Sequence, residues 1–192
     1  MTEHTIEPLT LDTWDAYARL IEKHNGVWGG CWCTWFHADD PDFPKKDTSG
    51  YDWKRRMVEL GIAHAALVFD GDEAIGWAEY GSPDELPRIY HRREYLAAET
   101  ELPRYRVTCF FIDRDHRRSG VSGEALAGAV ELIAAAGGGS VEGYPHDLPA
   151  GKKMSSSFLY NATRSMFESQ GFEYIRPLGT AKCVMRRTVA AA

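Results

Sequence analysis

One segment, from Val107 to Ala136, constrains the fold more than any other part of this sequence. Val107 to Ile112 is an uninterrupted apolar run rich in aromatic and β-branched residues, which is typical of a strand covered on both faces. A basic, glycine-containing loop, Arg117 to Gly123, leads into a helix whose apolar residues recur at helical spacing. Ser140 to Tyr144 then has the composition of a short strand. This succession predicts a parallel pair of strands with a right-handed crossover.

The rest of the chain predicts further strands and helices around this unit. Two apolar runs, Ala63 to Phe69 and Ala74 to Tyr80, flank an Asp-Gly-Asp-Glu turn and predict an antiparallel hairpin. Because the sequence has no internal repeat and no domain boundary, we expect one α/β domain over residues 1–192, with a central mixed β-sheet flanked by helices. Helices are expected over Leu11 to His24, Tyr51 to Leu60, Arg92 to Glu99 and Ala162 to Gln170, strands over Glu173 to Pro177 and Ala181 to Arg187, a lid insertion over 82–106 and a flexible tail over 188–192.

Charge and cysteine content exclude several classes of protein. The chain has 28 acidic and 22 basic residues and a net charge of −6, which argues against a nucleic-acid binder because neutralising phosphates needs a basic surface. No stretch approaches the roughly 18 apolar residues of a membrane-spanning helix, so we expect no membrane partner. Four cysteines and an N-terminus without the features of a secretory signal indicate reduced thiols in a cytoplasmic protein.

The loop before the long helix has the features of an anion site. Backbone amides at the start of a helix lack intrahelical acceptors and lie at the positive end of the helix dipole. Gly120 allows close approach of the main chain, and Arg117 and Arg118 add charge-assisted hydrogen bonds, which together favour binding of a pyrophosphate. The alternative is a plain glycine turn with two solvated arginines. The loop matches neither a dinucleotide-binding nor a Walker motif.

These residues resemble those of the GCN5-related N-acetyltransferase (GNAT) family, whose acetyl-CoA loop has the pattern Q/R-x-x-G-x-G/A. Arg117 to Ser122 fits except that Ser122 replaces the final glycine or alanine, and Met166 to Phe172 resembles the late helix and Gly-Phe pair of the family. The resemblance implies acetyl-CoA as cosubstrate and no metal. It further implies that the amides of Arg117, Arg118, Ser119, Gly120, Val121, Ser122 and Gly123 hold the pyrophosphate, and that Phe111, Ile112 and Asp113 pair with the pantetheine arm.

Direct acetyl transfer to an amine needs a proton acceptor and assistance to the leaving thiolate. Glu79 lies in an apolar strand, where burial would raise its pKa and suit it to act as the base, unless it points into solvent. His146 and Glu142 are alternatives. The tyrosine that usually serves as acid in the family is replaced by Phe167. Either Tyr160 takes its place, which makes Tyr160 more than a packing residue, or the thiolate leaves unassisted.

The tryptophan-rich stretch that follows the first predicted helix allows two interpretations. Cys31, Cys33 and His37 could supply three zinc ligands, but no fourth is evident and the spacing is short, so we predict no metal there. A cysteine nucleophile is not needed for direct transfer. Four aromatic residues either wall an acceptor pocket or fill the core: Trp28, Trp32, Trp35 and Phe36.

The sequence thus predicts an N-acetyltransferase that moves an acetyl group from acetyl-CoA to a primary amine of a small molecule by direct attack. An exposed terminal strand would allow a homodimer. The alternative is a non-catalytic acyl-CoA-binding or sensor module, which the phenylalanine at position 167 favours.

Overall fold

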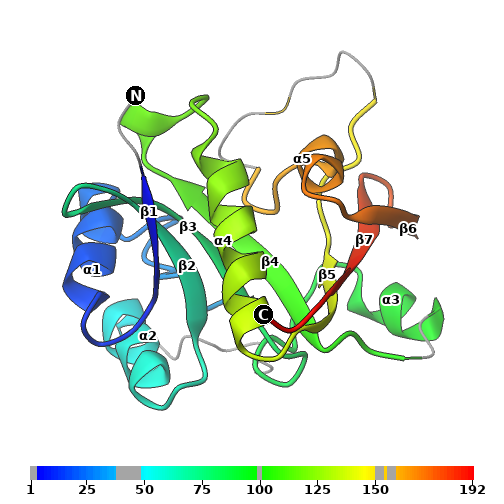
Figure 1. The fold of residues 1–192 in the computed structure, drawn as a ribbon, viewed down its shortest axis with the longest axis horizontal. Helices are drawn as coiled ribbons and strands as arrows, with labels where there is room; N and C mark the ends of the chain where they lie inside the picture. Colours follow the sequence, from blue (N-terminus) through cyan, green and yellow to red (C-terminus); the bar gives the residue numbers. More distant parts are fainter. Residues whose placement is uncertain (1–3, 38–48, 99–100, 150–153, 155–158) are drawn as a thin grey trace.

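A computed structural model describes residues 4–37, 49–98, 101–149, 154 and 159–192. Within these residues seven strands form one sheet in the order β1-β2-β3-β4-β5-β7-β6 (Figure 1). The strands are β1 (Thr5–Pro8), β2 (His64–Asp70), β3 (Glu73–Gly81), β4 (Tyr105–Ile112), β5 (Gly139–Gly143), β6 (Glu173–Leu178) and β7 (Lys182–Val189). The α-helices are α1 (Trp14–Lys23), α2 (Gly50–Glu59), α3 (Arg92–Ala98), α4 (Val121–Ala135) and α5 (Arg164–Ser169), and a 3-10 turn, η1, covers Arg114–His116.

The predicted α/β fold with a mixed, helix-flanked sheet is confirmed. β2 and β3 form the expected hairpin, β4 is the central strand, and β4 pairs with β5 in parallel, whereas every other neighbouring pair in the sheet is antiparallel. α4 connects the two parallel strands, as the strand–helix–strand succession predicts. In the described part of the chain, no helix is both long and apolar enough to cross a membrane.

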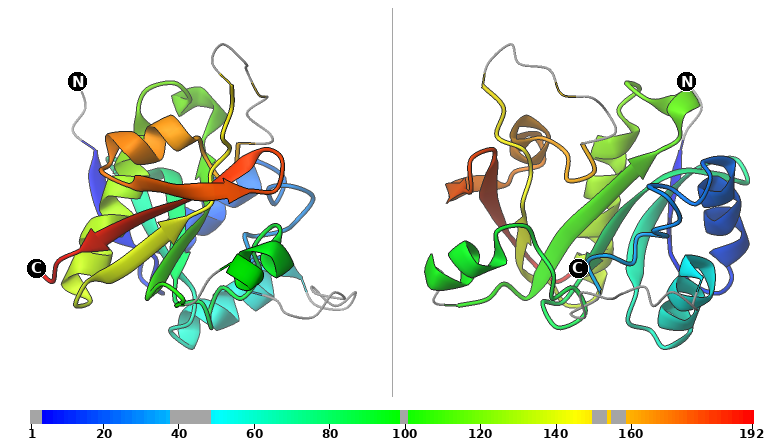
Figure 2. Two further views of the ribbon diagram at one scale, coloured as in Figure 1. Left: turned by 90° about the vertical axis from the view of Figure 1, so that its right-hand side faces the viewer. Right: turned by 180° about the vertical axis from the view of Figure 1, so that it is seen from behind.

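Alternating residues of the sheet supply two separate cores (Figures 1 and 2). One face packs against α1, α2 and the loop after α1, and the opposite face packs against α4 and α5. In β2, for example, Leu67 belongs to the first core and Val68 to the second, as the period of two in a strand requires. A smaller cluster joins Tyr95 of α3 to Tyr144, which follows β5, and to residues of β6 and β7.

The sheet opens between β4 and β5, and this opening positions the site. The two strands pair only from Tyr105 to Val107, opposite Val141 to Gly143. Farther along β4, the turn before α5 takes the place of a neighbouring strand: the Phe110 N–H donates to the Tyr160 carbonyl at 2.7 Å. The end of β4 that has no β5 residue beside it leads through η1 into the basic loop and α4.

Several predicted boundaries change. β1 was not expected, and α5 begins at Arg164, so Tyr160 lies in the preceding turn and not at the start of the helix. The tail predicted over 188–192 begins inside β7, since Val189 pairs with Gly139 and is buried. The segment predicted as a lid contains α3, whose Tyr95 is fully buried, and its last residues belong to β4; positions 99 and 100 lie outside the described residues.

Candidate active site

The basic loop ends in a helix N-terminus that no described side chain caps. Gly120 is the N-cap of α4 and has φ +96°, a conformation that favours glycine. Arg118 is also left-handed, with φ +69°. The N–H groups of Gly123 and Glu124 donate to the Gly120 carbonyl, at 2.8 and 3.2 Å. The N–H groups of Val121 and Ser122, which precede the first intrahelical bonds, can therefore donate to an anion.

A cavity of about 940 Å³ begins at this helix terminus and follows the open edge of β4. Three arginines and His116 lie around it at the loop end, and aromatic and aliphatic residues line the remainder. Of the ten predicted cofactor residues, seven contribute to its wall: Phe111, Ile112, Arg117, Arg118, Gly120, Val121 and Ser122. The other three, Asp113, Ser119 and Gly123, are not part of the wall.

Asp113 bonds to other parts of the protein, so fewer residues of the β4 edge can pair with a ligand than predicted. Its N–H donates to the Ile75 carbonyl of β3 at 2.8 Å, and its buried carboxylate accepts from Lys23 Nζ at 2.6 Å. Burial would raise the pKa of Asp113, but the hydrogen bonds from Lys23 and from the Asp115 N–H, together with the charges of Lys23 and His24, hold the pKa below its usual range. By alternation along β4, Ile112 directs its N–H to the same open side as Phe110. Ile112 is therefore the residue whose backbone can pair with a ligand.

Glu79 is buried, but its pKa is lowered, not raised. It lies at an irregularity in the pairing of β3 with β4 and is fully inaccessible. Burial would raise its pKa, but Lys54 at 2.7 Å and His37 at 3.1 Å lower it to about 2. Thr108 Oγ1 also donates to its second oxygen at 2.8 Å. The prediction of a raised pKa is wrong because the side chains of Lys54 and His37, which come from distant segments, lie against the carboxylate. Glu79 also does not line the cavity.

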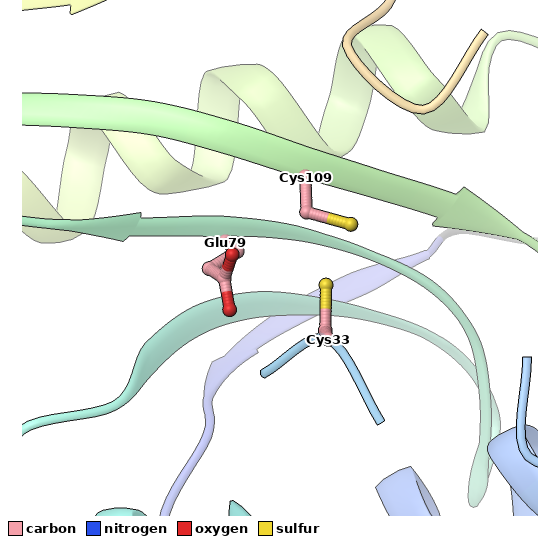
Figure 3. Close-up of side chains that lie close together, drawn as sticks. All are labelled: Cys33, Glu79 and Cys109. Atoms are coloured by element: carbon pink, nitrogen blue, oxygen red, sulfur yellow. The ribbon is translucent and has the colours of Figure 1, made fainter. Parts of the chain in front are cut away.

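Cys33 and Cys109 lie beside the same carboxylate (Figure 3). The sulfur of Cys33 points toward that of Cys109 on β4, and one ligand-type atom from each of Cys33, Glu79 and Cys109 fits within 4.8 Å. Burial raises the pKa of both thiols, which disfavours the thiolate that a metal or a nucleophilic step requires. The Lys54 ammonium already supplies a cation to Glu79. Cys31 is not part of this group.

Phe167 is a core residue, and Tyr160 is nearer to the cavity. Phe167 is fully buried, and its ring lies against Gly143 of β5 so closely that a Cβ there would come within 2.1 Å of it. Tyr160 is half-buried and packs edge-on against Trp28, at 5.5 Å between ring centroids. Trp28 lines the cavity and is 42% exposed. The ring of Tyr160 also lies beside that of Tyr90, with centroids 5.9 Å apart, and burial, followed by the nearby Tyr160 side chain, raises the pKa of Tyr90.

The aromatic residues of the loop after α1 divide between the core and the cavity wall. Trp32 and Phe36 are buried in the core, while Trp28 forms part of the cavity wall. Trp35 is half-buried and stacks on Tyr90, with ring centroids 4.7 Å apart. The aromatic rings thus extend from the cavity toward the segment before α3.

Two further ionisable residues, one of them not predicted, lie next to Tyr160. Lys182, at the start of β7, donates from Nζ to Asn161 Oδ1 at 2.6 Å and approaches His146 Nε2 at 3.3 Å. Burial lowers the pKa of Lys182 to about 8. Glu142, by contrast, is buried in bonds with Arg186, Tyr95 and Tyr144, away from the cavity. A lysine inside the apolar run around Cys183 and Val184 is the sequence signal that could have indicated this site.

The structure is similar to those of solved acetyltransferases. A protein described as a GNAT-family acetyltransferase from Desulfovibrio desulfuricans is 16% identical, with a TM-score of 0.51 over 98% of this chain and 100% of that one. An N-acetyltransferase from Staphylococcus aureus is 10% identical, with a TM-score of 0.52 over 99% of both chains. A protein described as an acetyltransferase from Acinetobacter baylyi gives 0.52 at 13% identity, over 100% and 97%. No protein-family model and no curated protein matches the sequence.

These similarities, together with the sheet that opens beside the basic loop, define the class of fold. The chain has the fold of the GNAT acetyltransferases, as the loop motif and the Gly-Phe segment predict. Sequence identities of this size establish the fold, and the activity must be argued from the site.

Proposed function

We propose that the protein is an N-acetyltransferase that transfers the acetyl group of acetyl-CoA to a primary amine of a small molecule. The observation that carries the proposal is the uncapped N-terminus of α4, with Arg117 and Arg118, at one end of a cavity that follows the open edge of β4. Such a helix terminus binds diphosphate through backbone amides and the helix dipole. The arginines add charge-assisted bonds to its oxygens.

The remaining part of the cavity suits an extended thioester. The backbone of Ile112 offers a donor to the pantetheine arm, and Phe110, Leu159 and Met166 provide apolar walls. At its far side, Trp28 gives the acceptor amine an aromatic surface. The cavity therefore holds the two substrates side by side, which is the main requirement for direct transfer.

Within the reaction, the neutral amine attacks the thioester carbonyl and the CoA thiolate leaves. Tyr160, whose ring packs against Trp28 of the cavity wall, is the residue we assign as proton donor to the thiolate. With a pKa of about 2, Glu79 is a carboxylate near neutral pH, but it is too weak a base to take a proton effectively from an ammonium with a pKa of about 10. We assign it instead to positioning Thr108 and the loop that carries His37.

A non-catalytic acyl-CoA sensor is the second candidate, and one observation favours it. The position that resembles the acid of the family holds Phe167, which is enclosed in the core and has no proton to give. A sensor would bind acetyl-CoA and release no free CoA with any amine. An enzyme would release CoA in proportion to the acetylated amine.

The test combines binding and turnover. We expect acetyl-CoA to bind and at least one member of a panel of alkylamines, arylalkylamines, amino acids and polyamines to be acetylated, as followed by free thiol release and by the mass of the product. Arg118→Glu should weaken acetyl-CoA binding at least tenfold, about 1.4 kcal/mol, through lost attraction and added repulsion at the diphosphate.

Arg55→Glu is the matched control, because the substitution changes the charge by the same amount at an exposed residue of α2 that does not line the cavity. Equal affinity in the wild type and both variants would reject the loop as the diphosphate site. Tight binding without thiol release for every amine would establish the sensor in place of the enzyme.

A further inference from the structure

Lys182 is a buried cation with an unusual set of neighbours. The residue is 7% exposed, and its Nζ lies over the ring of Tyr90, at 5.2 Å from the centroid, and over that of Tyr160, at 5.6 Å. Its hydrogen-bond partners are the Asn161 amide and the His146 imidazole. Among the described residues, no carboxylate lies within ion-pair distance of Nζ. Buried lysines are ordinarily paired with an acid, so this arrangement requires an explanation.

The surroundings of Lys182 tolerate both of its charge states. Aromatic faces and an amide oxygen stabilise the ammonium, whereas loss of the proton leaves no unpaired carboxylate behind. The titratable groups that face it are His146, from the segment after β5, Tyr160, from the turn before α5, and Tyr90, from the segment before α3. Cys183, next to it on β7, only opposes the lowering of its pKa to about 8 by burial.

Asn161, which is bonded to the open edge of β4, holds Lys182 in place. Asn161 Nδ2 donates to the Thr108 carbonyl of β4, which orients the amide so that its oxygen accepts the hydrogen bond from Lys182 Nζ. The same turn supplies Leu159 and Ala162 to the cavity wall. Lys182 lies behind Tyr160, whose ring packs on Trp28 of the cavity wall, and neither Lys182 nor Tyr160 is itself part of that wall.

We propose that Lys182 is the proton acceptor for the acceptor amine, which approaches it along Tyr160 at the aromatic end of the cavity. The inference rests on the proposed acetyl transfer and supplies the base that Glu79 cannot be. An alkylammonium is unreactive until it loses a proton, and a lysine made partly neutral by burial can take that proton near neutral pH.

One N–H bond of the acceptor ammonium breaks and one N–H bond forms on neutral Lys182 Nζ. The freed electron pair of the amine forms the C–N bond with the acetyl carbon, and the C–S bond breaks with its electron pair leaving on sulfur. Tyr160 gives a proton to the thiolate, and the second proton of the nitrogen replaces it. The proton on Lys182 returns to water past His146.

The first measurement is the charge of Lys182 itself. In protein labelled with carbon-13 at the lysine Cε, the Lys182 signal is assigned by its loss in Lys182→Met and is titrated in the presence and absence of acetyl-CoA. We expect a midpoint near 8. A midpoint above about 10 would mean a permanently charged ammonium at neutral pH and would overturn the proposal.

The second measurement separates proton transfer from fixed charge. Lys182→Met removes the amine, whereas Lys182→Arg keeps a positive charge that cannot accept a proton. With 2-phenylethylamine as acceptor, both variants should lose about 100-fold in rate near neutral pH and keep acetyl-CoA affinity within about twofold. Their rates should recover toward wild type as the pH rises toward about 10, where a substantial fraction of an alkylamine is uncharged. Rescue by arginine, or an equal loss at every pH, would show a structural or anion-binding role instead.

Failure of this inference is distinct from failure of the proposed function. If wild-type protein acetylates the amine and Lys182→Met keeps its rate and pH profile, only the role of Lys182 is lost. If the wild type does not bind acetyl-CoA, the proposed function falls, while the titration of Lys182 still decides whether its proton is exchangeable near neutral pH.

Discussion

At the scale of single residues, the partners of a buried group decide its charge. Glu79 and Lys182 are both almost inaccessible, but Glu79 faces Lys54 and His37, and Lys182 faces neutral atoms. The carboxylate therefore keeps its charge with a pKa of about 2, while the pKa of the lysine falls to about 8. Burial alone, which is all that a sequence indicates, predicts the second outcome and fails for the first.

Replacement of Glu79 tests this difference through the stability of the fold. The pKa of Glu79 is lower in the folded protein than its ordinary 4.5, so the stabilisation is complete above that value and is lost as the pH falls toward 2. Glu79→Gln leaves Lys54 buried without its counter-ion and should cost about 3–5 kcal/mol near pH 7. Urea unfolding should show this deficit shrinking between about pH 5 and about pH 3.

The matched control for this experiment is Glu59→Gln on the exposed side of α2, which should change the free energy of unfolding by less than about 0.5 kcal/mol. A deficit for Glu79→Gln that stays constant as the pH falls would show that its charge does not stabilise the fold.

At the scale of elements, two glycines at the start of α4 should respond oppositely to the same substitution. Gly120 has open space around it, but its φ of +96° is unfavourable for alanine, so Gly120→Ala should destabilise the protein by about 1–2 kcal/mol and weaken acetyl-CoA binding. Gly123 lies within the helix with room for a methyl group, so Gly123→Ala should stabilise by about 0.5–1 kcal/mol. Thermal unfolding and acetyl-CoA titration of both variants measure this; a similar loss in both would reject the conformational explanation.

The elements that can be predicted from the sequence are those whose own residues carry the pattern. The β2–β3 hairpin, the central β4 and α4 each carry their own periodicity and end signals. β1 has only four residues and ends in proline, so it has no pattern of its own. It forms because Ile6 fits against α4 at Gly128, where a Cβ would come within 2.6 Å. Such a fit between distant segments is not visible in either segment alone.

At the scale of the whole molecule, one part of the candidate site is contiguous in sequence and the other is assembled from distant segments. The basic loop is contiguous, and its place beside the helix was predicted, although Asp113 is held by Lys23, a residue of α1. The residues of the proposed acceptor side come from the loop after α1, the segment before α3, the turn before α5 and the start of β7. Only the insertion of β7 between β5 and β6 brings Lys182 to the opening of the sheet.

The response of the whole fold to ligand fragments tests how these parts act together. Acetyl-CoA at 100 times its Kd should stabilise the protein by about 2.7 kcal/mol, which for a chain of 192 residues raises Tm by roughly 5–10 °C. If the basic loop provides most of the binding energy, S-acetylpantetheine, which lacks the diphosphate, should raise Tm far less at the same concentration. Added salt should reduce the effect of acetyl-CoA and leave that of the fragment almost unchanged, because only the first depends on exposed arginines. Equal shifts for both ligands would place the binding energy along β4 instead of at the N-terminus of α4.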